Sequence, residues 1–538
     1  MKARPEPMSI PLIFVPAFMG TELKHKDCYQ KNNVNGNSNG NGNGNGNDNG
    51  NGNNNDLVYV NWKIGLNLST PDLSLPLKWD CTSQGDNNDI TSTSSSELSP
   101  SCLPVQAKDD IVPGGAMEQI QIDCCDCSAC CSWWCCFSTC SRSHSRCSCP
   151  ITILDQYSSF CQHYRNQNAS TLPASSSSSS SSGRPFYIFA YDWRRDLNES
   201  TDNLLQFIKE IHSKHGGVRP QVVSHSMGCL ITLAALHTEP TLFHSVLFVG
   251  GNFGGGAGFY PTNTEGMDVG FNKNYMSAKV CHTFPSMYAV ASPMGVGNDP
   301  ILKDDKKGGK QLFQFVDSES FMRCKNDNAS SSPFPSIVDI DMYNLEDWKR
   351  FKLGPYSLGE AVSPEMEEHV KICLKLGKHF QNRLRYPTVG NGGNDNEEKK
   401  NGNNYGNNND HDNDQDDSQN NSQGTILNQS DQYPPIAVLV GDQYLNPDFF
   451  LWDINASRWI EWNRQSLKRY KPNTKDFVRT DGTVSYISAS QPPLPNVVKN
   501  KVKEYKARNN GPGIGSHRQL MSDVEMIDKI LNDLQNSK

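Results

Sequence analysis

The sequence predicts a doubly wound α/β fold with a mostly parallel central sheet. Five short apolar runs have the continuous hydrophobicity of buried parallel strands, and helical patterns separate several of them. These runs are Pro11–Val15, Phe186–Ala190, Gln221–Ser224, Ser245–Gly250 and Ile436–Gly441. Strands that alternate with helices are typical of a sheet covered by helices on both faces.

Three segments carry helical patterns. Thr201–His212 places its apolar residues on one helical face, and either Asp196 or Thr201 is expected to cap its start. Cys229–His237 is apolar and follows a predicted strand after a very short turn. Met521–Leu534 is predicted as the last, amphipathic helix.

Much of the polarity of the 538 residues is concentrated in low-complexity tracts. Residues 31–56 are almost entirely Asn and Gly, 174–183 are mostly Ser, and 390–432 are mainly Asn, Asp, Gly and Gln. Such segments have too little apolar surface to offset the entropy lost on ordering. We therefore predict that these tracts are disordered insertions.

The rest of the chain divides into a core and two additions. We assign 8–30 to the first strand and the loop after it, 111–260 to the core, and 433–538 to its C-terminal part. Residues 57–110 and 261–389 contain no recognisable βαβ unit, so we predict a lid-like segment and a cap region there.

Charge and hydropathy exclude several classes of protein. A net charge of −8 argues against a nucleic-acid partner, because phosphate binding requires clustered Lys and Arg. The apolar run Ile10–Met19 is too short and too interrupted by Pro for a signal peptide or a transmembrane helix. We expect a cytoplasmic protein whose only membrane contact is peripheral.

The strongest local motif is Val222–Leu230, which contains Ser-His-Ser-Met-Gly between a predicted strand and a predicted helix. Strand, small–x–Ser–x–Gly and helix form the nucleophile elbow of the α/β-hydrolase fold. The sharp turn requires small residues, and here Ser224 stands where the first glycine is usual. The motif predicts that Ser226 is a nucleophile; the alternative is an ordinary connection that contains a serine.

Acyl transfer also requires two hydrogen-bond donors directed at the developing oxyanion. In this fold one donor is the backbone N–H after the nucleophile, and the other comes from a loop after an early strand. These positions predict Met227 and, in the loop Phe14–Gly20, Phe18.

A nucleophilic serine needs a histidine base, and the base needs an acidic partner. The chain order of the fold is Ser, Asp or Glu, then His, and only His411 and His517 follow His379. His411 lies in the Asn/Asp tract, so His517 is the candidate base; the alternative is a solvated loop histidine.

Two aspartates compete for the acidic role. Asp442 follows the predicted strand Ile436–Gly441, where many folds of this kind place their acid. Asp481 lies in Thr480–Ser485, whose Asp-Gly pair is also typical of a simple type I′ turn. We favour Asp481 and retain Asp442.

The chain resembles the lecithin:cholesterol acyltransferase and lysosomal phospholipase A2 family, with its microbial and plant lipase relatives. The matching residues are Pro11–Leu23, Pro113–Met117, Tyr191–Arg194, Ser224–Gly228, Asn252–Gly255, Asp481–Val484 and His517. Tyr-Asp-Trp-Arg followed by an amphipathic helix and His-Ser-Met-Gly is a specific combination. Two departures are Gly250–Asn252, where relatives often have Gly-Thr-Pro, and Ala17, where glycine is frequent.

The resemblance implies an α/β-hydrolase with lid and cap insertions and a Ser226–His517–Asp481 triad, which selects Asp481 over Asp442. It further implies a lipid substrate whose acyl group passes through Ser226 to water or an alcohol, with no metal or organic cofactor. The alternative function is a lipid-binding or scaffold protein that keeps the fold without turnover.

Three further features have open interpretations. Asp192 and Arg194 are expected to form a buried, structural ion pair. Trp62, Trp79 and the leucines between them form either a lipid-contacting lid or ordinary packing. Ten of the 18 cysteines crowd into 124–149. We interpret that segment as a functionless insertion, an acylated membrane tether or, as the least favoured interpretation, a zinc site formed by Cys124, Cys127 and Cys130.

Overall fold

The structure is a computed structural model. It describes residues 9–26, 64, 67–81, 103–122, 151–169, 183–253, 259–291, 313–316, 343–385, 432–447, 450–453, 458–460, 477–481, 483–484, 486–508 and 516–537. The tracts 31–56, 174–182 and 390–431, and the cysteine-rich segment 124–149, lie outside these residues.

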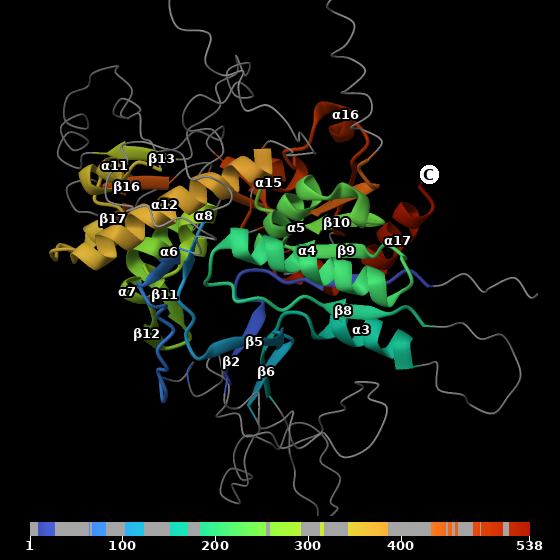
Figure 1. Cartoon of the computed structure of the whole chain (residues 1–538), viewed down its shortest axis with the longest axis horizontal. Helices are drawn as coiled ribbons and strands as arrows, with labels where there is room; N and C mark the ends of the chain where they lie inside the picture. The colour runs from blue at the N-terminus through green and yellow to red at the C-terminus, as the bar shows by residue number, and fades with distance from the viewer. Residues whose placement is uncertain are drawn as a thin grey trace, which may run out of the picture.

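A six-stranded sheet forms the centre of the molecule, in the order β19-β14-β10-β9-β1-β8 (Figure 1). Every neighbouring pair in this sheet is parallel. The strands are β1 (Leu12–Val15), β8 (Phe186–Ile188), β9 (Gln221–His225), β10 (Ser245–Val249), β14 (Ile436–Val440) and β19 (Lys503–Lys506). The first five confirm the predicted strands. The edge strand β19 was missed because its sequence, Lys-Glu-Tyr-Lys, is polar and largely exposed.

Helices cover both faces of this sheet, which confirms the doubly wound α/β prediction. Alternate strand residues enter opposite layers, so that in β9 Val222 packs in one core and Val223 in the other. The first core includes side chains of α4 (Leu197–Lys214), α5 (Met227–Thr238) and α12 (Pro364–Arg385). The second includes side chains of α3 (Ser158–Ala169) and α17 (Val524–Gln535).

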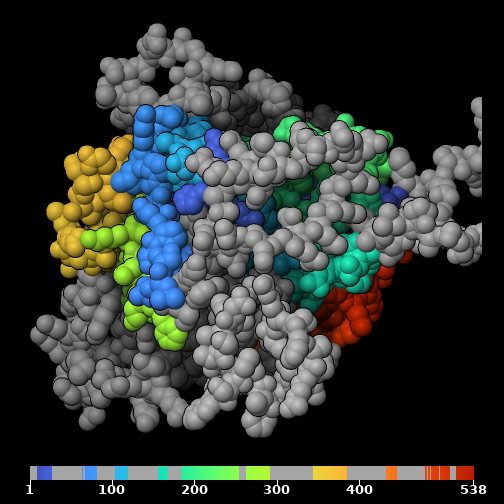
Figure 2. All heavy atoms as spheres, turned by 90° about the horizontal axis from the view of Figure 1, so that it is seen from below, coloured from blue at the N-terminus to red at the C-terminus, as the bar shows by residue number. Residues whose placement is uncertain are grey.

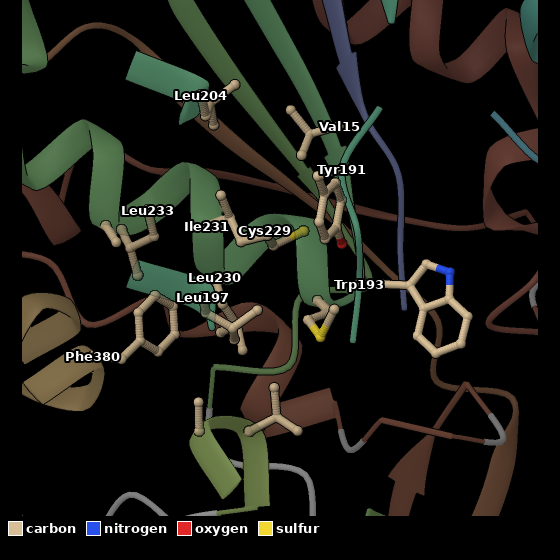
Figure 3. Close-up of a cluster of buried hydrophobic side chains, with 14 of the residues drawn as sticks. Val15, Tyr191, Trp193, Leu197, Leu204, Cys229, Leu230, Ile231, Leu233 and Phe380 are labelled. Carbon is tan, nitrogen blue, oxygen red and sulfur yellow. The ribbon is translucent and has the colours of Figure 1, made fainter. Parts of the chain in front are cut away.

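Buried apolar side chains form most of the contact between α4, α5 and α12. Figure 3 shows Leu197 and Leu204 of α4, Leu230 and Leu233 of α5, and Phe380 of α12 in this cluster. Because α5 follows the sheet's central strand directly, this packing fixes the position of its N-terminus relative to β9.

One helix start agrees with a prediction and one differs. Helix α4 begins at Leu197, and the Asp196 side chain accepts a hydrogen bond from the Asn198 N–H, which confirms Asp196 rather than Thr201 as its cap. Helix α17 begins at Val524 rather than Met521. Asp523 caps it, and a short 3₁₀ helix, η10 (Gln519–Ser522), precedes it.

Smaller elements surround the main sheet. The short helices are η6 (Pro240–Leu242), α6 (Phe259–Glu265), α7 (Ala278–Cys281), α8 (Pro285–Ala291), α11 (Leu345–Arg350), η7 (Gly354–Leu358), α15 (Tyr486–Ser490) and α16 (Asn496–Lys499). The antiparallel pairs are β2 (Thr21–His25) with β5 (Ile111–Ala116), β3 (Trp79–Cys81) with β4 (Pro104–Gln106), β6 (Gln119–Ile122) with β7 (Ile151–Asp155), β11 (Gly266–Val269) with β12 (Asn272–Ser277), and β15 (Tyr444–Pro447) with β18 (Phe477–Thr480). A further three-stranded sheet contains β13 (Phe313–Val316), β16 (Phe450–Asp453) and β17 (Arg458–Ile460).

Arg194 is fully buried and contacts three parts of the chain through ion pairs and a hydrogen bond. Its guanidinium lies 2.7 Å from the Asp192 carboxylate and 2.8 Å from that of Asp109. It also donates a 2.9 Å hydrogen bond to the Leu73 carbonyl. The predicted buried ion pair of Asp192 with Arg194 is thus confirmed, and Arg194 also pairs with Asp109. Through Arg194 the loop after β8 is connected to residues 73 and 109.

Residues 67–81 pack against the β11–β12 hairpin, as Figure 2 shows (blue beside yellow-green). The Asn272 amide donates hydrogen bonds to the Ser69 carbonyl (3.1 Å) and the Thr70 hydroxyl (3.0 Å). Leu73 and Leu75 are buried, whereas Leu68 is 68% exposed. Leu73 and Leu75 therefore fit the interpretation as ordinary packing, and the exposed Leu68 fits that of a lipid-contacting lid. Trp62 and Leu66 lie outside the described residues.

Among the described residues, none of the helices has both the length and the apolar composition needed to cross a bilayer.

Candidate active site

Ser226 lies in a sharp turn between β9 and α5. Its backbone has φ 53° and ψ −120°, a conformation that side chains rarely adopt and that costs on the order of 1–3 kcal/mol. The Ser226 N–H donates a 3.0 Å hydrogen bond to the Val249 carbonyl of the neighbouring strand β10. The turn therefore has the strained strand-to-helix geometry that the motif predicted.

Gly228 allows the elbow to lie directly against the end of β1. A Cβ atom at this position would stand 2.4 Å from the Pro16 carbonyl oxygen and 2.5 Å from that of Val15. Both contacts are with backbone, so a side chain would require one of the two segments to move. The glycine thus brings the loop after β1 beside the N-terminus of α5.

His517 lies between Ser226 and Asp481 and is hydrogen-bonded to both. Its Nε2 is 2.8 Å from the Ser226 Oγ, and its Nδ1 is 2.7 Å from the Asp481 Oδ2. A carboxylate only accepts hydrogen bonds, so Nδ1 carries the proton and Nε2 accepts from the serine hydroxyl. The three residues converge from positions 226, 481 and 517.

Asp481 is buried and held in place from several directions. Its Oδ1 accepts hydrogen bonds from the backbone N–H groups of Thr483 (3.0 Å) and Val484 (2.7 Å). Its carbonyl accepts a 2.8 Å hydrogen bond from the N–H of His517. These hydrogen bonds fix the orientation of the carboxylate toward the imidazole.

The rival aspartate, Asp442, is not brought to this cluster. Its carboxylate instead lies 3.4 Å from the Arg479 guanidinium and 3.3 Å from the Lys506 ammonium. Both basic side chains are largely exposed, so this is a surface ion-pair group.

The two predicted oxyanion donors belong to two segments, the start of α5 and the loop after β1, which meet at Gly228. Met227 is the first residue of α5, where an N–H has no acceptor within its own helix. Phe18 lies in the loop after β1, and its ring packs 4.9 Å from that of Trp193. The Tyr191 hydroxyl steadies this loop by a 2.9 Å hydrogen bond to the Pro16 carbonyl.

His225 and Tyr157 were not predicted as site residues. The His225 ring is 4.8 Å from that of His517, and the Tyr157 hydroxyl is 2.9 Å from the His225 Nδ1. Burial, and secondarily the neighbouring His517, hold the pKa of His225 well below its ordinary value. No sequence spacing relates Tyr157 to residues almost seventy positions later.

Within the described residues, no three His, Cys, Asp or Glu side chains are grouped as metal ligands. The candidate zinc ligands Cys124, Cys127 and Cys130 lie outside those residues.

Comparison with known proteins gives one family match. Residues 183–371, which include the elbow and part of the predicted cap, match the model of the family "Lecithin:cholesterol acyltransferase". No curated protein matches the chain. A solved chain from "The crystal structure of Tle4-Tli4 complex" is similar at 11% identity over 66% of this chain and 70% of that chain, with a TM-score of 0.35. That similarity is too weak to support any argument.

The family match, the parallel sheet with helices on both faces and the strand–elbow–helix geometry agree with the resemblance seen in the sequence. The chain therefore has the α/β-hydrolase fold, and its residues 183–371 are similar to the lecithin:cholesterol acyltransferase family.

Proposed function

We propose that this protein is a serine lipid acyl hydrolase or O-acyltransferase. Its substrate is a fatty acyl ester of a phospholipid or acylglycerol, cleaved through an acyl-serine intermediate. The observation that supports this proposal best is the hydrogen-bonded series Ser226–His517–Asp481 at the end of the central strand β9.

Each residue of the series has one role in the proposed mechanism. His517 Nε2 removes the Ser226 hydroxyl proton while the oxygen attacks the ester carbonyl. Asp481 keeps the proton on Nδ1 and stabilises the imidazolium that forms. The N–H groups of Phe18 and Met227 stabilise the oxyanion.

The second half of the reaction reverses these roles. Collapse of the tetrahedral intermediate expels the alcohol part of the lipid, which receives the proton from His517, and leaves the acyl group on Ser226. Water or an acceptor alcohol then attacks the acyl-serine, with His517 again acting as base. The acceptor decides between hydrolysis and transfer.

Two measurements test this proposal. A fluorophosphonate probe should label wild-type protein at Ser226, as located by peptide mass spectrometry. Incubation with vesicles of a defined phospholipid, with and without an added long-chain alcohol, should release fatty acid alone or form a new ester as well. An unlabelled protein that still binds the vesicles would instead support the lipid-binding alternative.

We also propose that the protein meets its substrate at a lipid surface, through the tip formed by Leu68 and Phe271. These side chains are 68% and 78% exposed. The bonds from Asn272 to Ser69 and Thr70 connect their two segments. Moving such exposed apolar side chains from water into a lipid surface lowers the free energy of the system.

Replacing both tip residues by serine should weaken binding to phospholipid vesicles by at least about tenfold, because burying each large side chain contributes roughly 1.5–3 kcal/mol. Vesicle co-sedimentation measures the effect. Tyr444→Ser, which changes an exposed aromatic residue in β15, is the control and should bind like the wild type. Equal binding by the double variant would rule out this tip as the contact.

A further inference from the structure

His225, the residue before the nucleophile, is 1% exposed and hydrogen-bonded through both ring nitrogens. Its Nε2 lies 2.9 Å from the backbone carbonyl oxygen of His517, and its Nδ1 lies 2.9 Å from the Tyr157 hydroxyl. The Tyr157 oxygen in turn accepts hydrogen bonds from the Ala17 N–H and the Gln156 side-chain amide, both at 3.1 Å.

The partners fix the position of every proton in this group. The His517 carbonyl can only accept, so the Nε2 of His225 carries the proton. Its Nδ1 is then an acceptor, and the Tyr157 hydroxyl donates to it. The remaining lone pairs of the tyrosine oxygen receive the two amide donors. All buried polar atoms of the group are satisfied by this one arrangement of a neutral imidazole.

Burial favours the same protonation states. It lowers the pKa of His225 well below the ordinary value, with a smaller contribution from His517, so the ring stays neutral. Burial also raises the pKa of the Tyr157 hydroxyl, which therefore remains a donor. The protons are not expected to redistribute near neutral pH.

The group connects the parts of the site that must stay aligned. The backbone N–H of His517 donates to the Asp481 carbonyl, and its carbonyl accepts from His225, so the base is held on both sides. Ala17, at the other end of the group, directly precedes Phe18 in the loop after β1. His225 itself is covalently joined to the nucleophile.

We propose that His225 and Tyr157 are positioning residues, which hold the base His517 and the loop after β1 in fixed relation to Ser226. This inference rests on the proposed function. Neither residue touches the reacting atoms; both act through backbone groups. A displacement of about 1 Å in a reacting group is enough to reduce a rate by about 100-fold.

Four variants separate the two hydrogen bonds. In His225→Gln the side-chain amide reaches the place of Nε2 and retains a donor for the His517 carbonyl. In His225→Asn the amide oxygen replaces Nδ1 and retains the acceptor for Tyr157 only. His225→Phe removes both bonds while keeping a ring, and Tyr157→Phe removes only the hydroxyl.

We expect kcat on a short, water-soluble ester to fall about 100-fold in His225→Phe and His225→Asn, with KM nearly unchanged. His225→Gln should stay within about tenfold of the wild type, because it preserves the bond to the base. Tyr157→Phe should lose about tenfold, as expected for one buried hydrogen bond. Rates are measured below the Tm of every variant and normalised to folded protein.

The chain offers a matched control in His237, which is also 1% exposed. Its Nδ1 lies 2.8 Å from the Tyr433 hydroxyl and its Nε2 lies 3.1 Å from the Pro493 carbonyl, so it makes the same two kinds of bond. It stands at the far end of α5 from Ser226. His237→Phe should lower Tm as much as His225→Phe does, without changing kcat.

The rate of fluorophosphonate labelling distinguishes failure of this inference from failure of the proposed function. Wild-type protein that does not react at Ser226 refutes the function. If the wild type reacts, the positioning role is refuted when His225→Phe labels at the wild-type rate or His237→Phe slows equally. If His225→Phe does not fold, the labelling rates of the two amide variants decide. His225→Gln should then react faster than His225→Asn, and equal rates for the two would contradict the positioning role.

Discussion

Ser226→Ala is expected to lower kcat for ester cleavage by about 10⁶-fold, the loss typical of removing a triad nucleophile. The substitution removes the Oγ that lies 2.8 Å from His517 Nε2 and alters no other atom of the elbow. The protein should remain folded, because the change removes a single hydroxyl and adds no atoms to the packed elbow. Steady-state hydrolysis of a soluble ester by the purified variant measures the effect.

The matched control lies two residues earlier in the same motif. Ser224 is fully buried, and its hydroxyl has no hydrogen-bond partner among the described residues. Ser224→Ala should therefore keep activity within a few-fold of the wild type. More than a few per cent of activity in Ser226→Ala would exclude it as the nucleophile.

Asp481→Asn should lower kcat by about 10⁴-fold. Asparagine fits the same space and can still accept from the Thr483 and Val484 N–H groups, but it has no charge to stabilise the imidazolium. It also permits the wrong tautomer, in which Nε2 is protonated and cannot accept from Ser226. The measurement is kcat on the same soluble ester, with Tm recorded to show that the fold is intact.

Asp442→Asn is the comparison for this prediction, because Asp442 was the rival acid. It removes only an ion pair to exposed Arg479 and Lys506, and such pairs contribute about 0–1 kcal/mol to stability. Its effect on kcat should be small. A larger loss in Asp442→Asn than in Asp481→Asn would transfer the acidic role to Asp442.

The elements that sequence reasoning predicted are those in which local pattern and tertiary environment agree. Strands such as β9 and β14 are buried on both faces, so they appear as continuous apolar runs. The elbow was recognisable because steric need selects small residues at fixed spacing. The start of α4 was left open between Asp196 and Thr201, because the regular apolar pattern begins only after Leu197 and Asn198.

Other features depend on contacts that no local pattern records. The edge strand β19 is polar, and only its pairing with β14 makes it a strand. The choice between Asp442 and Asp481 required the family resemblance, since both follow strands and both are acidic. Tyr157, directly before α3, meets His225 only because α3 packs on the sheet that contains β9, and Asp109 joins Arg194 in the same long-range manner.

The contact of Gly228 with the carbonyls of Val15 and Pro16 also bears on how the strands find their alignment. In a sheet with one solvent-exposed face, sliding a strand by one residue exposes its apolar side chains to water. The hydrophobic effect alone then disfavours the shifted register. Strands β1 and β9 are buried on both faces, so the same slip would leave apolar residues in both layers. It would, however, bring Met227 or Cys229, each with a Cβ, to the point of closest approach. Because glycine has no Cβ, only the register that places Gly228 at this point avoids a steric clash. The same steric requirement therefore favours correct pairing of β1 with β9 and correct placement of Ser226.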